Sequence, residues 1–73
     1  MIIEKIENNH RWAIMRDGDL FYILIWMHGM YRHFYFWENV YNSVEAARAT
    51  IERVSVMNRR GLFTERYIET SCA

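Results

Sequence analysis

The chain has 73 residues, of which 52% are hydrophobic and 16% aromatic, and nine Lys and Arg residues balance nine Asp and Glu residues. This composition excludes an intrinsically disordered chain, and the balanced charge excludes a strong global field toward nucleic acid or an anionic membrane. Because Cys72 is the single cysteine, an internal disulfide is excluded, and the core must hold the domain together, alone or with oligomerisation.

Neither the start of the chain nor its most apolar stretch indicates a membrane protein. The opening MIIEKIENN has no apolar core after a basic start, unlike a signal peptide. The stretch LFYILIWMHGMYRHFYFW, residues 20–37, approaches the length of a membrane span, but its uninterrupted apolar part ends at Met27. That part has the length of a strand. We therefore expect a cytoplasmic protein, and the lone thiol fits a reducing compartment.

Two glycine-containing turns divide the first half of the chain into strands. Asp17–Gly18 is a strong signal for a two-residue hairpin turn, and His28–Gly29 is a weaker one. They predict antiparallel strands near residues 10–16, 19–27 and 30–38. Asn8–Asn9 can form a further turn, which would add a short edge strand from Ile2 to Glu7.

A helix is expected after the sheet, over residues 43–60. Asn42 or Ser43 can cap its start, and Asn42 with Glu45 resembles a capping box. One apolar stripe follows helical spacing: Val44, Ala47, Ile51 and Val54, with Met57 beside it. Gly61 ends the helix.

The predicted fold class is α+β, in one small domain. A three- or four-stranded antiparallel meander spans about residues 10–38, and one helix over about 43–60 packs on one of its faces. The tail, residues 61–73, is either a final strand or a short helical turn.

Two-residue turns would place Met15 opposite Leu20 and Trp26 opposite Tyr31. Alternation along the strands then separates two chemically different faces. The first, which the helix is expected to cover, collects Trp12, Ile14, Phe21, Ile23, Ile25, Met27, Met30, Phe34 and Phe36, with Arg32 as its one interior charge. The second, here called the aromatic face, collects Ala13, Met15, Leu20, Tyr22, Leu24, Trp26, Tyr31, His33, Tyr35 and Trp37.

The aromatic face is the candidate binding surface, because one helix cannot easily cover both sides of a sheet. Tyr and Trp combine a large apolar body with a polar tip and are enriched at binding hot spots. The expected contact residues are Tyr22, Trp26, Tyr31, His33, Tyr35 and Trp37. Two alternatives remain open: the tail at 62–68 covers this face, or a second copy of the chain buries it in a homodimer.

The residue types that carry catalysis or bind metals are not arranged for either role. His10, His28, His33 and Cys72 lack zinc-type spacing, and Cys72 lies beside the terminus, where no pocket activates it. The sequence contains no glycine-rich phosphate loop and no nucleophile elbow. We therefore expect no enzymatic activity, no cofactor and no metal ion.

Two function classes follow from these features. The first is a protein-binding module whose aromatic face docks on a host protein or protein complex and acts by occlusion. The second is a nucleic-acid-binding regulator, in which aromatic rings stack on bases and basic side chains contact phosphates. The candidate phosphate or acidic-partner contacts are Arg11, Arg48, Arg53, Arg59 and Arg60. The balanced net charge favours the first class.

The order of elements resembles that of several small bacterial and phage proteins. RWAIMRDGDLFYILIWMHGMYRHFYF followed by NSVEAARATIERV is similar to the β-β-β-α layout of CedA-type cell-division activators, which bind DNA. It also resembles small phage inhibitors of bacterial RNA polymerase, in which a final strand follows the helix, as LFTERYIET would here, and some anti-CRISPR proteins. The resemblance spans residues 11–68 and implies inhibition or regulation of a host macromolecular machine, RNA polymerase or a nucleic-acid defence complex.

Overall fold

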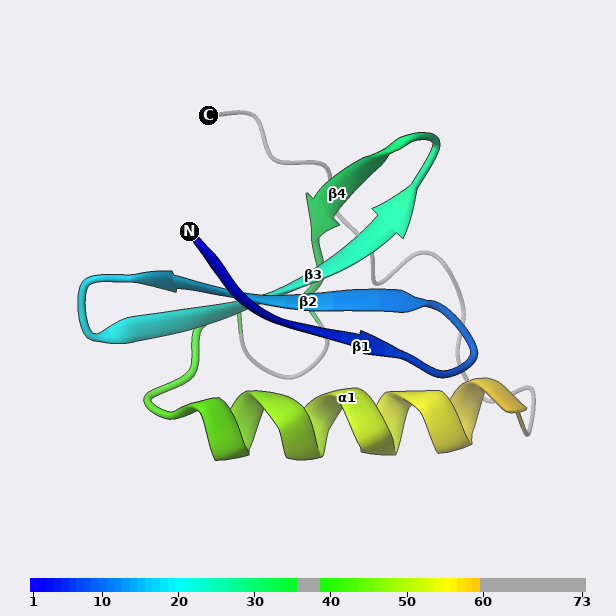
Figure 1. Cartoon of the computed structure of the whole chain (residues 1–73). Coiled ribbons are helices and arrows are strands. Elements are labelled where there is room, and N and C mark those ends of the chain that lie inside the picture. Colours follow the sequence, from blue (N-terminus) through cyan, green and yellow to red (C-terminus); the bar gives the residue numbers. More distant parts are fainter. Residues whose placement is uncertain (36–38, 60–73) are drawn as a thin grey trace.

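The computed structural model describes residues 1–35 and 39–59, which form one antiparallel sheet packed on one helix (Figure 1). The strands, which neighbour one another in chain order, are β1 (Ile2–Glu7), β2 (Arg11–Asp17), β3 (Leu20–Met27) and β4 (Met30–His33). The helix α1 (Val44–Arg59) packs against β2 and β3. The predicted α+β meander with one helix on one face is therefore confirmed, with four strands.

β1 confirms the edge strand expected from Ile2 to Glu7. It pairs antiparallel with β2, placing Lys5 opposite Ala13, and its register shifts at a bulge between Ile2 and Glu4. A bulge twists an edge strand, and this twist discourages pairing of the β1 edge with strands of other chains.

The first hairpin turn differs from the prediction. Met15 lies opposite Tyr22, not Leu20, because Asp17 still pairs with Leu20 and the two turn residues are Gly18 and Asp19. Gly18 has φ 66°, and a glycine at the first central position is what a type II′ turn requires. The error is two residues along the strand pair, so it leaves every side chain on its predicted face.

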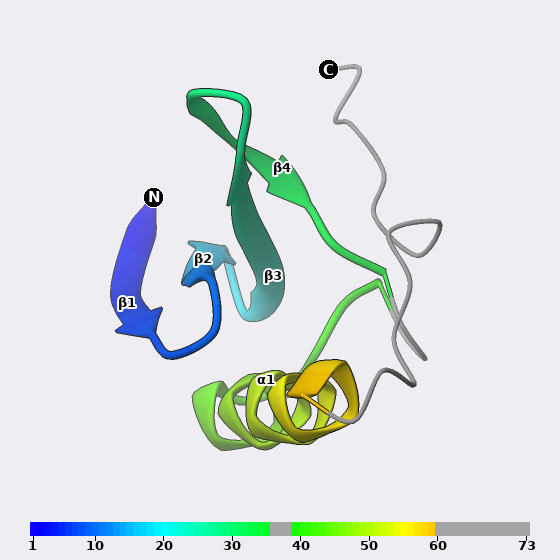
Figure 2. The same ribbon diagram turned by 90° about the vertical axis from the view of Figure 1, so that its right-hand side faces the viewer.

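The second hairpin confirms the predicted pairing of Trp26 with Tyr31. His28 and Gly29 have φ values of 52° and 83°, so both central residues adopt the left-handed conformation of a type I′ turn. Figures 1 and 2 show this hairpin bending away from α1.

β4 is shorter than the predicted strand over residues 30–38. Its regular pairing ends at His33, although the Phe34 N–H still donates to the Ile23 carbonyl at 2.9 Å. Residues 36–38 lie outside the described part of the chain. The chain then returns to the edge of β3 that β4 pairs with. There, Phe21 and Tyr41 exchange two backbone hydrogen bonds of 2.9 and 2.8 Å.

The core lies between the sheet and α1, on the face predicted to be covered. Trp12 and Phe34 meet edge to face, with ring centroids 5.1 Å apart. Met30 was predicted for this face but is exposed at the hairpin end, and Tyr41 joins the core from outside the predicted set. The buried cluster contains Trp12, Ile14, Ile23, Ile25, Phe34, Tyr41, Ala47, Ile51 and Val54.

Ser43, the residue directly before the helix, is its N-cap. The Ala46 N–H donates to Ser43 Oγ at 3.1 Å, which satisfies one otherwise unpaired amide of the first turn. The structure therefore selects Ser43 from the two predicted caps, and the Asn42–Glu45 capping box is wrong by one residue.

Replacing Ser43 with alanine is expected to lower the free energy of unfolding by about 1 kcal/mol, the usual effect of losing an N-cap. Urea denaturation followed by circular dichroism measures this difference. Asn42→Ala is the matched control and should leave the midpoint almost unchanged. An equal loss in both variants would contradict the assignment of the cap.

Within the described part of the chain, no helix is both long and apolar enough to cross a membrane.

Candidate functional site: the aromatic face

The aromatic face is the side of the sheet that points away from α1. Tyr22, Trp26 and His33 lie there because each follows or precedes a core residue of β3 or Phe34, and Tyr31 lies there because it pairs with Trp26. Figure 2 shows α1 on the opposite side. Trp37, which was also predicted for this surface, lies outside the described residues.

Two groups of rings form on this face. Trp26 and Tyr31, opposite one another on β3 and β4, meet at 4.9 Å between centroids and 79° between planes. His33 lies between Tyr22, at 5.6 Å and 81°, and Tyr35, at 6.0 Å and 47°. The Trp26–Tyr31 and Tyr22–His33 contacts are edge-on, which suits the ring quadrupoles, and the His33–Tyr35 contact is tilted. The five described members of the predicted contact set thus form two groups of contacting rings.

Two cations lie over the Trp26–Tyr31 pair. The Lys5 ammonium is 5.9 Å from the Tyr31 ring centroid, and the Arg11 guanidinium carbon is 5.9 Å from the Trp26 ring. Both distances allow cation–π attraction. Lys5 was not among the predicted site residues, although it could have been placed here once β1 was accepted, because it pairs with Ala13 of this face.

The aromatic face is partly covered by its own side chains. Ala13 and Leu24, in the two central strands, are buried although α1 lies on the other side of the sheet. Tyr31 belongs to β4 and Lys5 to β1, so their contact passes over β2 and β3. Trp26 remains 38% exposed. Part of the surplus aromatic surface therefore packs on itself, and Trp26 is the most open of the rings that the structure describes on this face.

One ring nitrogen of His33 is closed to solvent. Its Nδ1 is buried, and no hydrogen-bond partner for it exists in the structure as described. The Nδ1 atom is therefore not exposed for contact with a partner.

The three candidate arginines whose side chains the structure describes do not form one basic surface. Arg11 lies on the aromatic face, whereas Arg48 and Arg53 belong to α1, on the other side of the sheet. Nothing is described of the Arg59 side chain, and Arg60 lies outside the described residues. Arg11, Arg48 and Arg53 therefore do not form a continuous phosphate-binding stripe.

Arg48 instead ties α1 to the edge strand. Its Nε and Nη2 donate to the two carboxylate oxygens of Glu4 at 2.8 and 2.7 Å. This bidentate contact lowers the pKa of Glu4 from its usual value, chiefly through the hydrogen bonds, and raises the pKa of Arg48.

The Glu4–Arg48 pair predicts a specific pH dependence of stability. A carboxyl group whose pKa is lowered in the folded chain stabilises it fully above its unfolded pKa of about 4.5, and this stabilisation is lost as the pH falls through the folded value. Glu4→Gln should therefore flatten the stability profile between about pH 5 and 3, and Arg48→Met should flatten it equally. Thermal melts at a series of pH values measure this, and parallel profiles for wild type and Glu4→Gln would refute it.

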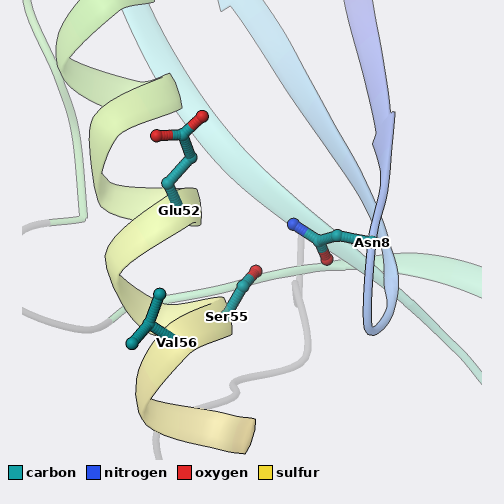
Figure 3. A pocket seen from close by; sticks show the side chains of 4 residues that line it. All are labelled: Asn8, Glu52, Ser55 and Val56. Atoms are coloured by element: carbon teal, nitrogen blue, oxygen red, sulfur yellow. The ribbon is translucent and has the colours of Figure 1, made fainter.

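A hollow of about 280 Å³ lies between the β1–β2 turn and α1, lined by Asn8, Glu52, Ser55 and Val56 (Figure 3). Its polar groups serve the fold. Asn8 Oδ1 accepts a hydrogen bond from Trp12 Nε1 at 2.9 Å, and the Asn9 side-chain amide donates to the Ser55 carbonyl at 2.8 Å. These bonds connect the β1–β2 turn to the core and to α1, so the polar groups around the hollow have a structural role.

Among the described side chains, no three His, Cys, Asp or Glu residues are grouped closely enough to hold a metal ion. Comparison with known proteins found no matching family model, no matching curated protein and no matching solved structure.

Proposed function

We propose that this protein is a non-enzymatic binding module whose aromatic face docks on a larger host protein or protein complex. The observation that carries the proposal is the Trp26–Tyr31 pair, held edge-on at 4.9 Å on the sheet face away from α1, with Trp26 38% exposed. Trp and Tyr are the residue types most enriched at binding hot spots.

The geometry of the rings supports such a role energetically. Tyr22, His33 and Tyr35 are already in contact, and Trp26 and Tyr31 are held by each other and by two cations. Side chains that are ordered before binding lose less conformational entropy when the partner arrives. A partner that covers Trp26 and the exposed Leu20 would remove apolar surface from water without reorganising the sheet.

We propose inhibition or regulation of a macromolecular machine as the biological consequence, such as RNA polymerase or a nucleic-acid defence complex. This step rests on the resemblance of the last three strands and the helix, β2 to β4 and α1, to the β-β-β-α layout of small phage and bacterial regulators. The role is served by occlusion alone, because a bound domain of this size blocks the surface that it covers.

Direct binding of nucleic acid is the weaker candidate. Single-stranded nucleic acid is bound by a basic groove that tracks its backbone, whereas Lys5 and Arg11 are the described cations over the rings of this face. The described arginines also lie on different sides of the sheet. Steep loss of binding between low and moderate salt, with retention by a Trp26→Ser variant, would favour this candidate instead.

The test compares Trp26→Ser with Val56→Ser as bait in bacterial lysate, followed by quantitative mass spectrometry. Val56 is also 38% exposed but lies on α1, so it controls for loss of exposed apolar surface. Proteins that dock on the aromatic face should be recovered about tenfold less with Trp26→Ser and normally with Val56→Ser, as expected for a hot-spot tryptophan. An identical set and yield for both variants would refute the proposal.

A further inference from the structure

We propose that the partner segment that docks on the aromatic face is acidic and apolar. Its carboxylates would pair with Lys5 and Arg11 while an apolar side chain packs against Trp26. This inference rests on the proposed function and specifies the chemistry of the partner.

One side chain from each of the four strands contributes to this surface. Arg11 of β2 lies over Trp26 of β3, Trp26 meets Tyr31 of β4, and Lys5 of β1 lies over Tyr31. The successive separations are 5.9, 4.9 and 5.9 Å. The result is a pair of rings flanked by two cations, hereafter the cation–ring cluster, in which both charges are ordered by the rings they cover.

The charges of this cluster are only partly compensated within the described chain. No carboxylate of the described residues forms a salt bridge with Lys5. Arg11 has Glu7 at 3.5 Å, but the two side chains are 62% and 74% exposed, so water largely screens their attraction. Both cations can therefore accept a carboxylate from a partner, Lys5 directly and Arg11 by exchange with Glu7.

The Trp26–Tyr31 ring pair, which lies between the two cations, indicates that part of the partner is apolar. Trp26 is exposed beside Arg11, and a ring of this size offers a large apolar surface. Two cations over two rings suit a short acidic segment with an apolar residue better than a phosphate backbone, which recruits a longer run of basic residues. Within the described part of this face, Lys5 and Arg11 are the basic residues that lie over aromatic rings.

The experiment titrates the full chain with a random copolymer of glutamate and tyrosine and follows tryptophan fluorescence. Polylysine serves as the opposite-charge control and oligo(dT) as the phosphate control. We expect the acidic copolymer to bind, polylysine not to bind, and oligo(dT) to bind more weakly. Raising NaCl from about 0.05 to 0.3 M should weaken copolymer binding about threefold or more, because exposed charges are screened.

Three charge variants assign the binding to the cation–ring cluster. Lys5→Met and Arg11→Met should each reduce copolymer affinity about fivefold, as expected for lost exposed ion pairs close to an interface. Arg53→Met removes the same charge from the exposed side of α1 and should leave affinity unchanged. Glu7→Gln should increase affinity about twofold, because it removes the carboxylate that competes for Arg11. All four residues are exposed, and circular dichroism verifies that each variant is folded.

The outcomes separate this inference from the proposed function. No copolymer binding, equal effects of Lys5→Met and Arg53→Met, or tighter binding of oligo(dT) would overturn the acidic partner. If the acidic partner fails in this way while Trp26→Ser still loses its lysate partner, the docking face stands with a partner of different chemistry. If Trp26→Ser loses nothing in lysate, the proposed function itself fails.

Discussion

Replacing Trp12 with alanine is expected to unfold most of the protein at room temperature. Trp12 is fully buried, packs edge to face against Phe34, and donates its indole N–H to Asn8 Oδ1 at 2.9 Å. Loss of a buried tryptophan costs about 3–5 kcal/mol. A domain of this size has a total stability of roughly 3–5 kcal/mol, so the substitution removes most or all of it.

The matched control is Trp26→Ala, in the neighbouring strand on the other face. Trp26 would lose its ring contact with Tyr31 and its cation contact with Arg11, worth together about 1–2 kcal/mol, so this variant should remain folded. Far-ultraviolet circular dichroism with urea titration measures both variants. Equal destabilisation by the two substitutions would contradict the assignment of Trp12 to the buried face of the sheet and Trp26 to the open face.

Replacing Ile51 with alanine is expected to lower the free energy of unfolding by about 2–5 kcal/mol. Ile51 is fully buried in the middle of α1, between Ala47 and Val54 of the same stripe, where it packs into the core formed with the sheet. A cavity at this position weakens the packing of α1 against β2 and β3. The urea midpoint should fall steeply with no change in slope.

Glu52→Ala is the control for Ile51→Ala because it changes the next residue of the same helix on the exposed side. Exposed substitutions of this kind usually alter stability by less than about 0.5 kcal/mol. A loss as large as that of Ile51→Ala would contradict the assignment of the buried stripe. A negligible effect of Ile51→Ala would show that α1 contributes little to the fold.

The elements that sequence reasoning predicted well are those with strict local rules. Alternation in β2 and β3 assigned Trp12 and Ile23 to the core, and the stripe through Ala47 and Ile51 oriented α1. The two-residue turn at His28–Gly29 fixed the pairing of Trp26 with Tyr31. These rules need only the chain itself, because the period of side-chain direction is a property of the backbone.

The errors arise where more than one local solution exists. A glycine suits either central position of a two-residue turn, so the Asp17–Gly18 signal left the register of Met15 open by two residues. Ser43 and Asn42 are equally good caps by residue type, and the entry geometry of the helix selects between them. Tyr41 joins the core because the chain returns to β3 after a loop, which no local pattern indicates.

The sequence predicts which residues share the face of the candidate site, but not how their side chains contact one another. Alternation placed Tyr22, Trp26, Tyr31 and His33 on one face, as the structure has them. The contact of Lys5 with Tyr31 depends on the curvature of the whole sheet, because the two residues belong to its opposite edges. Likewise, Arg48 is a candidate phosphate contact by residue type, but in the structure its guanidinium group donates hydrogen bonds to the Glu4 carboxylate.

If the aromatic face is open to a foreign partner, the protein is a monomer in solution, and its mass in solution shows whether it is. Light scattering from micromolar to millimolar concentration, on wild type and Trp26→Ser, measures this mass. We predict a monomer in both cases, which leaves the Trp26–Tyr31 surface available. A stable wild-type dimer that becomes monomeric in Trp26→Ser would contradict the account, because the face would then be buried in its own copy.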